Sequence, residues 1–334
     1  MKIIVTGAAG FMGSHLVDAL VKEGHEVHSL DDLSGGFIEN VNKESTFVEL
    51  DLRNKYETER IVKEIKPEII FHLAADATEG RSQFTPIECT SRNYTAYLNL
   101  LIPAIKTGME KIVVFSSMAV YGSQRTPFNE DMEPKPEDIY GVSKAAMEAS
   151  TKILSEVYGF DYTILRPHNV YGPRQNMADP YRNVIAIFMN CLLRNKTFYI
   201  YGDGQQKRAF SYIDDQIPCM MRAGFDGKTN GEIINLGPVK EITINGLAEM
   251  VLRVSGSRLK PVYMPPRPRE VKDAWCTNGK AVRLLGYKDT VSIEEGVKSM
   301  WAWAKAAGPK TPRYIDALEL VNDKIPKTWK NKMI

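Results

Sequence analysis

The stretch Thr6-Gly7-Ala8-Ala9-Gly10-Phe11-Met12-Gly13 joins a short apolar run, residues 3–5, to a segment with the periodicity of an amphipathic helix, residues 11–22. Glycines at this spacing suit a bound pyrophosphate. The first permits a tight turn, the second lets the backbone approach the ligand, and the third lets the helix pack closely on the strand. The N-terminus of the helix adds free N–H groups and a positive dipole end. The stretch therefore predicts a dinucleotide site, with an ordinary turn as the alternative if the glycines are taken alone.

Short β-branched runs alternate with longer amphipathic stretches along the first half of the chain. We expect strands at residues 3–5, 26–30, 69–72, 112–115 and 163–165, and a helix between the last two at about residues 140–158. Strands that alternate with helices predict βαβ units. The first half is therefore expected to be an α/β fold of the Rossmann type, a doubly wound parallel sheet with helices on both faces.

In the second half of the chain, prolines and glycines separate shorter elements. We expect a Rossmann-type dinucleotide-binding domain at residues 1–173, a smaller, loop-rich α/β substrate domain at residues 174–308 and a basic tail at residues 309–334. Residues 232–237 again have the pattern of a strand, which is expected to rejoin the first sheet. Within the tail, residues 315–321 are expected to form a short helix.

Composition excludes several classes of protein. The 334 residues hold 43 Lys and Arg against 41 Asp and Glu, a net charge of +2, which argues against a nucleic-acid-binding protein with a broad basic surface. The four cysteines are far apart and the five histidines form no spaced set, so neither a disulfide framework nor a metal site is expected. No run of about 18 apolar residues occurs. We therefore expect a cytoplasmic protein with no membrane or nucleic-acid partner.

Two acidic residues support the dinucleotide prediction. Asp31 stands at the end of the second expected strand, eighteen residues after Gly13. A carboxylate there accepts hydrogen bonds from the adenosine ribose, and an acidic residue favours NAD over NADP. Asp51, which follows the run Phe47-Val48-Glu49-Leu50, is a candidate partner for the adenine amino group. Ordinary polar turns are the alternative interpretation of both positions.

Three further residues form a candidate catalytic set. Tyr140 and Lys144 are four residues apart, so one helix face carries both side chains. We expect the lysine to lower the pKa of the phenol, and a bound cationic nicotinamide to lower it further, which would make the tyrosine a base near neutral pH. Ser117 follows an expected strand, 23 residues before Tyr140, and would hydrogen-bond the same substrate oxygen. Chance alone explains one Tyr–Lys pair at this spacing, but not the ordered combination with the glycines and the acid.

The chain resembles the extended short-chain dehydrogenase/reductase family, and within it the NAD-dependent nucleotide-sugar epimerase and dehydratase group. The resemblance spans residues 1 to about 306. It implies that Tyr140 removes the proton of a sugar hydroxyl while NAD takes the carbon-bound hydride. Besides the residues above, the matching motifs are His72-Leu73-Ala74-Ala75, Ser116-Ser117-Met118-Ala119-Val120-Tyr121-Gly122, Arg166-Pro167-His168-Asn169-Val170-Tyr171-Gly172-Pro173, Gly202-Asp203-Gly204 leading to Arg208-Ala209-Phe210, and Arg267-Pro268-Arg269-Glu270.

The resemblance also implies which residues bind the cofactor and the substrate. Contacts to NAD are expected from Gly7, Gly10, Phe11, Met12, Gly13, Asp31, Asp32, Asp51, Leu52, Leu73, Ala74, Ala75, Asn93, Tyr140, Lys144 and His168. Contacts to a nucleotide-diphosphate sugar, with UDP as the expected nucleotide, are expected from Ser117, Tyr140, Asn169, Arg182, Arg208, Phe210, Arg267 and Ala274.

The residues after Ser117 distinguish among the reactions of the family. Family 4,6-dehydratases carry an Asp-Glu pair here, because eliminating water needs an added acid and base, and similar decarboxylases carry a glutamate two positions after the hydroxyl residue. This chain has Met118 and Ala119, which exchange no protons. The resemblance therefore implies a nucleotide-sugar 4-epimerase of the UDP-glucose/UDP-galactose type. A transient 4-keto sugar would turn over and take the hydride back from a tightly bound, recycled NAD.

Several positions bear on the substrate. The small Ala274 matches a position whose bulk governs whether a 2-acetamido sugar fits, so N-acetylated hexoses are candidates. Arg182 lies in a segment that, in uronate epimerases, supplies an arginine for the C6 carboxylate. A UDP-glucuronate 4-epimerase is therefore the main alternative, and a reductase or dehydratase of the same family is another. Asp76 and Arg269 replace residues usual in the family and are unexplained.

Two expectations concern the molecule as a whole. By family analogy, the helices at about residues 87–106 and 140–158 pair across a two-fold axis as a four-helix bundle, so a homodimer is expected. A non-catalytic NAD-sensing role is the alternative from another class of function. The presence of Ser117, Tyr140 and Lys144 argues against it.

Overall fold

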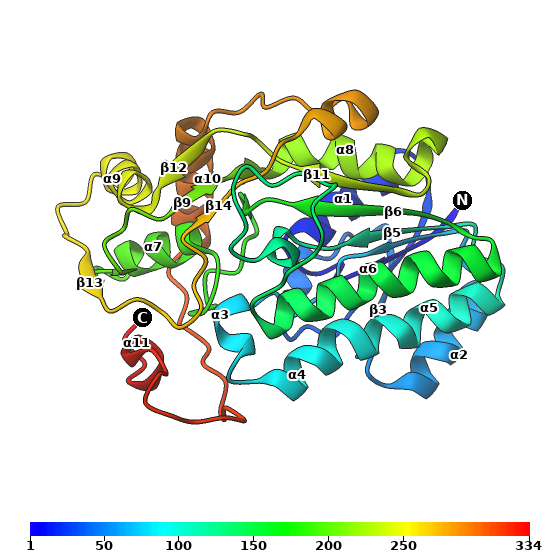
Figure 1. Cartoon of the computed structure of the whole chain (residues 1–334), viewed down its shortest axis with the longest axis horizontal. Coiled ribbons are helices and arrows are strands. Elements are labelled where there is room, and N and C mark those ends of the chain that lie inside the picture. Colours follow the sequence, from blue (N-terminus) through cyan, green and yellow to red (C-terminus); the bar gives the residue numbers. More distant parts are fainter.

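A parallel sheet of seven strands organises the computed structural model, which describes residues 1–334 (Figure 1). The strand order is β11-β6-β5-β4-β1-β2-β3. In β1, Thr6 pairs with Leu30 of β2 on one side and with His72 of β4 on the other. Successive strands build outward first in one direction and then in the other, and this reversal opens a crevice at the carboxyl ends of the strands. The strands are β1 (Lys2–Thr6), β2 (Glu26–Asp31), β3 (Thr46–Glu49), β4 (Ile69–His72), β5 (Lys111–Phe115), β6 (Asp161–Pro167) and β11 (Glu232–Leu236).

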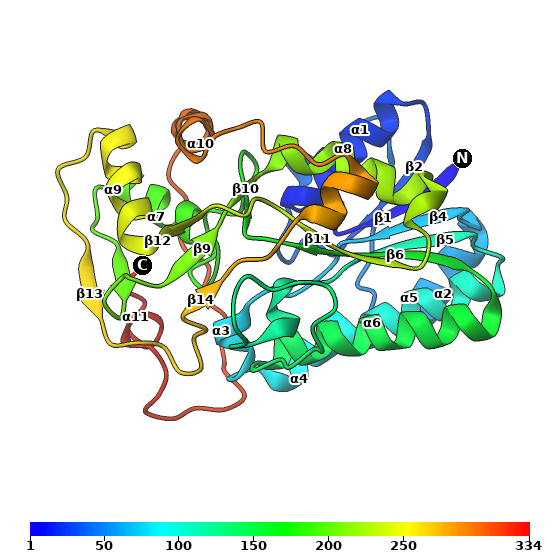
Figure 2. The same cartoon turned by 45° about the horizontal axis from the view of Figure 1, so that its top comes forward.

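Helices cover both faces of this sheet (Figure 2). Ile3 and Val5 of β1 pack in one core with α1 and α8, while Ile4 packs in another core with α2, α5 and α6. Alternate residues of one strand therefore enter two cores, as in a strand buried on both sides. The predicted Rossmann-type, doubly wound α/β fold is confirmed. The helices are α1 (Phe11–Lys22), α2 (Lys55–Ile65), α5 (Ala96–Lys106), α6 (Ile139–Tyr158) and α8 (Ile213–Phe225).

The helix expected at residues 87–106 has three consecutive segments. It consists of α4 (Pro86–Thr90), a π-helical turn at Ser91–Thr95 and then α5. The short helix α3 (Glu79–Ser82) precedes it in the connection from β4. None of the helices combines the length and the apolar composition needed to cross a bilayer. The remaining short turns of this part are helical at Ile38–Asn40, Met118–Tyr121, Gly227–Thr229 and Ala281–Leu285.

The second half of the chain contributes partly to the large sheet and its helices and partly to a separate core. α8 and β11 return to the large sheet, where β11 pairs with β6 at the edge. The rest surrounds a separate core of 24 buried residues, built on three helices and three small sheets. These elements are α7 (Val184–Leu193), α9 (Ile244–Ser255), α10 (Ile293–Ala307), the pair β7 (Val170–Tyr171) and β10 (Ser211–Tyr212), the pair β8 (Tyr199–Tyr201) and β13 (Val262–Met264), and the trio β9 (Lys207–Ala209), β12 (Glu241–Thr243) and β14 (Asp273–Ala274).

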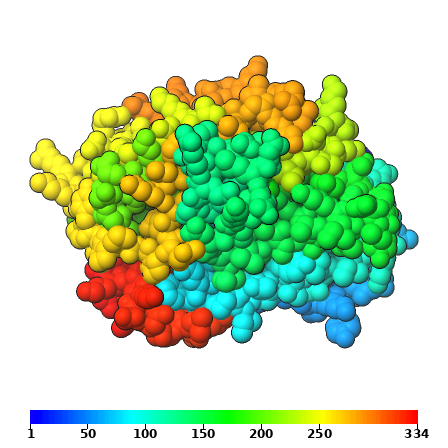
Figure 3. Space-filling view, in the orientation of Figure 1, coloured from blue at the N-terminus to red at the C-terminus, as the bar shows by residue number.

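The tail, residues 309–334, lies against α3 and α4 rather than extending into solvent (Figure 3). The prediction of a helix at residues 315–321 is wrong, because the only helix of the tail is α11 (Lys327–Lys330). The backbone groups of this segment bind neighbours instead of one another. The N–H of Ile315 donates to the Tyr181 hydroxyl, and the N–H groups of Glu319 and Leu320 donate to the Phe84 carbonyl. Long-range hydrogen bonds thus replace helical ones.

Candidate active site

One cavity of about 900 Å³ runs from the carboxyl ends of β1 and β2 to β9, the loop at residues 267–271 and the tail. Nearly all of the predicted site residues line it, although they come from widely separated parts of the sequence. Asn93 and His168 do not line it, and both side chains are fully buried. The predicted residues that line the cavity are Gly7, Gly10, Phe11, Met12, Gly13, Asp31, Asp32, Asp51, Leu52, Leu73, Ala74, Ala75, Ser117, Tyr140, Lys144, Asn169, Arg182, Arg208, Phe210, Arg267 and Ala274.

The glycine loop has the geometry of an anion site. Gly7 adopts a left-handed φ of +69°, and a Cβ there would stand 2.8 Å from the amide nitrogen of Ala74. A Cβ on Gly13 would stand 2.1 Å from the Gly7 carbonyl oxygen, so only glycine fits. The N–H groups of Phe11 and Met12, at the start of α1, have no acceptor within the protein. Free N–H groups at a helix N-terminus beside the cavity fit a dinucleotide pyrophosphate.

Asp31 is held in place at the end of β2. Its carboxylate accepts hydrogen bonds from the N–H of Ala9 at 3.0 Å and from the N–H of Leu33 at 2.8 Å. Burial raises the pKa of Asp31, and these two hydrogen bonds oppose the rise. The remaining acceptor capacity of the carboxylate is directed to the cavity that it lines. This arrangement fits the hydroxyl groups of a ribose.

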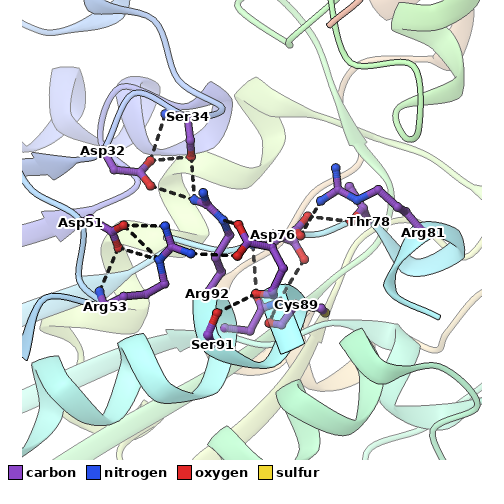
Figure 4. A network of polar contacts seen from close by, with 12 residues as sticks. Asp32, Ser34, Asp51, Arg53, Asp76, Thr78, Arg81, Cys89, Ser91 and Arg92 are labelled. Carbon is purple, nitrogen blue, oxygen red and sulfur yellow. Dashed lines mark hydrogen bonds and ion pairs between the residues drawn. The ribbon is translucent and has the colours of Figure 1, made fainter. Parts of the chain in front are cut away.

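A network of ion pairs borders the same end of the cavity (Figure 4). Arg92 binds Asp32 at 2.8 Å and also Glu88, which in turn binds Arg53 at 2.8 Å. Arg53 also donates to both carboxylate oxygens of Asp51, through Nε to Oδ1 at 3.0 Å and through Nη2 to Oδ2 at 2.6 Å, and these bonds lower the pKa of Asp51. Because Arg53 occupies the Asp51 carboxylate, its contact with adenine stays a prediction.

Three fully buried residues, His72, Asn93 and His168, are neighbours of residues that line the cavity. The Nδ1 atom of His72 lies 2.9 Å from the Thr6 hydroxyl, within β1 and β4. Asn93 hydrogen-bonds both the N–H and the carbonyl of Asp76, each at 3.1 Å, and so holds the loop after β4. Burial lowers the pKa of His72 to about 3 and that of His168 to about 4, so both imidazoles are neutral. Asn93 and His168 were predicted to touch the cofactor; neither lines the cavity, and their contacts with NAD stay predictions.

The three predicted catalytic residues meet where β5 ends and α6 begins. Ser117 follows β5, and its hydroxyl accepts a hydrogen bond from the Ala119 N–H at 3.1 Å. Tyr140 and Lys144 project from the first turns of α6, and the lysine Nζ lies 5.7 Å from the centroid of the phenol ring. The Lys144 ammonium donates to the Phe115 carbonyl at 2.6 Å. One short segment of strand and one helix end thus bring together a hydroxyl, a phenol and an ammonium.

The pKa of Tyr140 is raised in the chain by itself, so the expectation that Lys144 and a bound nicotinamide lower it stays a prediction. Burial raises the pKa of Tyr140, Glu79 raises it further, and the Ser117 hydroxyl only partly opposes this. Lys144 is itself 1% exposed, which lowers its pKa to about 8. Its Nζ is also engaged by the Phe115 carbonyl rather than by the phenol oxygen. Ionisation of the phenol at neutral pH therefore requires additional positive charge in the cavity.

A buried ion pair that the sequence analysis missed fixes the position of α6. Glu148 lies one turn beyond Lys144 and binds Arg166 of β6 through two hydrogen bonds, at 2.9 and 2.6 Å. Glu148 also accepts a hydrogen bond from the Ser116 hydroxyl, and Arg166 donates to the Tyr121 hydroxyl at 2.6 Å. The pair ties α6 to β5 and β6, directly beside the catalytic residues. The spacing of residues 140, 144 and 148 on one helix face is the signal that could have identified it.

The opposite end of the cavity carries arginines. Arg208 of β9 donates to the carbonyl groups of Val271 and Lys272, which fixes its guanidinium at the cavity wall. Arg267 binds Glu270 at 2.6 Å and lies over the ring of Tyr201, 4.7 Å from its centroid. Guanidinium groups held in this way suit the oxygens of a diphosphate.

The other predicted substrate residues lie between the two ends. Asn169 donates through Nδ2 to the Ala209 carbonyl at 2.8 Å, and Phe210 packs edge-on against Tyr171. The Nε atom of Arg182 binds Asp179 at 3.0 Å. Ala274 is a buried residue of β14, and its small side chain forms part of the cavity wall.

Carboxyl groups from other loops were also missed. Met118 and Ala119 form a 3₁₀ turn and supply no acid, as the sequence predicted, but Glu79 and Asp138 also line the cavity. Asp138 is the N-cap of α6 and accepts from the Gly141 N–H at 2.7 Å. Burial and the neighbouring Glu79 raise the pKa of Asp138. Only the fold brings Glu79 near Tyr140, since α3 and α6 are remote in sequence, whereas Asp138 precedes Tyr140 by two residues.

The chain is similar to known nucleotide-sugar epimerases in both sequence and structure. Residues 3–237 match the model of the family described as NAD dependent epimerase/dehydratase. The UDP-glucose 4-epimerase of Mycolicibacterium smegmatis is 35% identical over 306 residues, which are 89% of this chain and 96% of that protein. The structure of Thermotoga maritima UDP-glucose 4-epimerase with UDP-glucose has a TM-score of 0.87 and 36% identity, covering 92% of this chain and 99% of that one. The structure of Bacillus cereus UDP-glucuronic acid 4-epimerase with UDP-glucuronic acid and NAD has a TM-score of 0.85 and 30% identity, covering 92% and 100%.

Proposed function

Because the chain belongs to the NAD dependent epimerase/dehydratase family, we propose that it is a nucleotide-sugar 4-epimerase that interconverts UDP-glucose and UDP-galactose. One observation carries the proposal. Ser117, Tyr140 and Lys144 border the same cavity as the glycine loop, while Met118 and Ala119 stand where a dehydratase needs an acid and a base. The site can therefore remove a proton from a hydroxyl group, but the residues beside Ser117 cannot assist the loss of water.

In this proposal each residue has a defined task. The glycine loop and Asp31 would hold NAD, which would supply reversible hydride transfer at sugar C4. The Tyr140 phenolate oxygen accepts the proton of the C4 hydroxyl and later gives it back, while Ser117 hydrogen-bonds the same sugar oxygen. Lys144, fixed by the Phe115 carbonyl, keeps positive charge beside the phenol. The sum of the two half-reactions is inversion at C4 without net oxidation.

The substrate assignment rests on the other end of the cavity. Arg208 and Arg267 would hold the diphosphate while the keto sugar turns, because a fixed anchor at the nucleotide leaves the hexose free to rotate. Asn169 and Phe210 would contact the nucleotide sugar beside them. Ala274 leaves room for a 2-acetamido group, so N-acetylated UDP-hexoses are included in the proposed substrates.

UDP-glucuronate is the second candidate substrate. Arg182 lines the cavity near Tyr140 and would bind a C6 carboxylate, and the Bacillus cereus uronate epimerase is similar to the chain over 92% of its length. Against this, the Nε atom of Arg182 already binds Asp179. We therefore rank UDP-glucose and UDP-galactose first.

The test is incubation with a panel of UDP-, dTDP- and GDP-sugars, followed by NMR analysis for C4-inverted products. We expect C4 inversion of UDP-glucose without stoichiometric consumption of NAD. The Tyr140→Phe variant should lose turnover while it retains bound NAD, which excludes misfolding as the cause. A protein that holds NAD but inverts none of these sugars would contradict the proposal.

We also propose a cytoplasmic homodimer that pairs through α4, α5 and α6. The outward faces of these helices expose Ile87, Ile102, Ile153 and Val157, with exposed fractions of 75%, 44%, 61% and 66%. Apolar side chains of this size, gathered on neighbouring helices, suit an isologous four-helix contact. Sedimentation equilibrium of the wild type and of an Ile153→Glu variant tests this, since a monomeric wild type would refute it.

A further inference from the structure

Glu79 has an unpartnered carboxyl group inside the cavity. It opens α3, and its side chain is exposed to the cavity that it lines. No hydrogen-bond donor or basic group of the protein binds its oxygens. Three acidic residues of the same cavity wall are paired with arginines, as Asp76–Arg81 at 2.5 Å, Asp179–Arg182 at 3.0 Å and Glu270–Arg267 at 2.6 Å, and the neighbouring Asp138 accepts a hydrogen bond from the Gly141 N–H. An acceptor left free in a site that a ligand would close costs free energy unless the ligand supplies a donor.

Glu79 and Tyr140 line the same cavity, and the helix α3 that begins at Glu79 packs against α6. The charge of Glu79 raises the pKa of Tyr140, more than any effect except burial. Its own pKa is raised by its position deep in the cavity and lowered by Arg208 and Arg267. The packing agrees with this, because α3 packs against α6, which carries Tyr140, and a Cβ on the adjacent Gly80 would stand 3.8 Å from the Nη1 atom of Arg267. Glu79 therefore lies between the phenol and the arginines proposed to hold the diphosphate. The hexose of a nucleotide sugar would occupy this space.

We propose that Glu79 is a specificity-determining residue of the hexose subsite, whose carboxylate accepts a hydrogen bond from the sugar and disfavours a hexose with a carboxylate at C6. The inference rests on the function proposed above and chooses between its two candidate substrates. A neutral hexose satisfies the free acceptor with a hydroxyl proton. A uronate would place a second carboxylate next to the first, which a specific site uses to reject a competitor.

The arginine that favours a uronate does not cancel this effect. Arg182 shares its charge with Asp179, and Arg81 shares its charge with Asp76. In each pair, the carboxylate already compensates the positive charge of the arginine before any ligand binds. Glu79 therefore contributes negative charge to the hexose subsite without a paired arginine of its own.

The test compares the wild type with Glu79→Gln, which keeps the size of the side chain and removes its charge. Glu64→Gln, on the outer surface of α2, is the matched control. Affinity for UDP-glucose and UDP-glucuronate is measured by calorimetry on the NAD-loaded protein, and kcat and KM are measured by the NMR assay. We expect Glu79→Gln to improve the affinity for UDP-glucuronate relative to UDP-glucose by at least about tenfold, since like-charge contacts are strongly unfavourable. Glu64→Gln should leave the ratio unchanged.

A second readout separates this role from a structural one. Four charged or titratable groups surround Tyr140. They are Glu79 of α3, Asp138 at the start of α6, Arg182 in the loop before α7, and Lys144 on the same helix as Tyr140. Since Glu79 raises the pKa of the phenol, Glu79→Gln should shift the acidic limb of the kcat profile to lower pH.

Two results would overturn the inference: a ratio of affinities that Glu79→Gln leaves unchanged, or a wild type that binds UDP-glucuronate more tightly than UDP-glucose. The calorimetric readout does not depend on turnover. A ratio that changes as expected in a protein without epimerase activity would therefore contradict the proposed function and not the role of Glu79.

Discussion

Replacing Trp329 by alanine tests whether the tail is a structural part of the enzyme. Trp329 lies in α11, is 5% exposed, and packs nearly perpendicular to two aromatic rings. Its ring centroid is 6.4 Å from that of Phe84 and 5.2 Å from that of Tyr181. The first contact reaches the segment between α3 and α4, and the second reaches the loop before α7. One side chain thus connects the tail to two walls of the cavity.

The expected loss of stability follows from these contacts. Truncating a buried tryptophan to alanine costs about 3–5 kcal/mol, depending on how far the site can collapse. The edge-to-face pairs with Phe84 and Tyr181 account for about 0.5–1.5 kcal/mol each within that loss. We therefore expect a fall of about 3 kcal/mol in the free energy of unfolding.

Binding should change together with stability. A Cβ added to Gly80 would stand 3.3 Å from the Cη2 atom of Trp329, so the indole packs directly against the residue after Glu79. Loosening this contact should raise KM for the nucleotide sugar several-fold and leave the NAD content unchanged, because the glycine loop is at the other end of the cavity.

Urea unfolding followed by circular dichroism measures the first effect, and the NMR epimerase assay measures the second. Trp303→Ala is the matched control, since Trp303 is a half-buried residue of α10 that does not line the cavity. It should cost less stability and leave KM unchanged. A loss below about 1 kcal/mol for Trp329→Ala, with an unchanged KM, would show that the tail is not packed as described.

Three further perturbations have defined outcomes. Glu148→Ala leaves Arg166 buried without its carboxylate, so the free energy of unfolding in urea should fall by about 3–5 kcal/mol; a smaller loss than for an exposed glutamate such as Glu64 would contradict the assignment. Gly13→Ala places a Cβ against the Gly7 carbonyl, so purified protein should contain much less NAD, whereas Gly279→Ala, outside the cavity and with open space around it, should retain it. The neutral His72 has a pKa of about 3 in the folded state against 6.5 in the unfolded state, so only the unfolded state gains a proton as the pH falls below about 6.5. Stability should therefore decline by about 3 kcal/mol from this imidazole between pH 6.5 and 4, and His72→Gln should show a correspondingly shallower pH dependence of urea unfolding.

The sequence by itself determined most of the strands of the sheet, the glycine turn before α1 and the placement of Tyr140 and Lys144 on one helix. Each of the strands β1, β2, β4, β5 and β6 lies within one or two residues of an apolar run visible in the sequence. The spacing of Gly7, Gly10 and Gly13 also predicts the tight turn, and the four-residue spacing of Tyr140 and Lys144 predicts that both lie on one helix face. The backbone conformation of a tight turn or of one helix face involves only a few consecutive residues, so the printed order of amino acids is sufficient to predict it.

The tertiary structure alone decided how the charges are paired and which surfaces close the cavity. The ion pair of Glu148 with Arg166, the free carboxyl of Glu79 beside Tyr140, and the packing of Trp329 on Phe84 join segments that are far apart in the sequence. The pKa of Tyr140 rises for the same reason, because burial and a remote carboxylate outweigh the nearby lysine. Burial and electrostatic energy depend on distance in space rather than on position along the chain, so no local pattern reveals them.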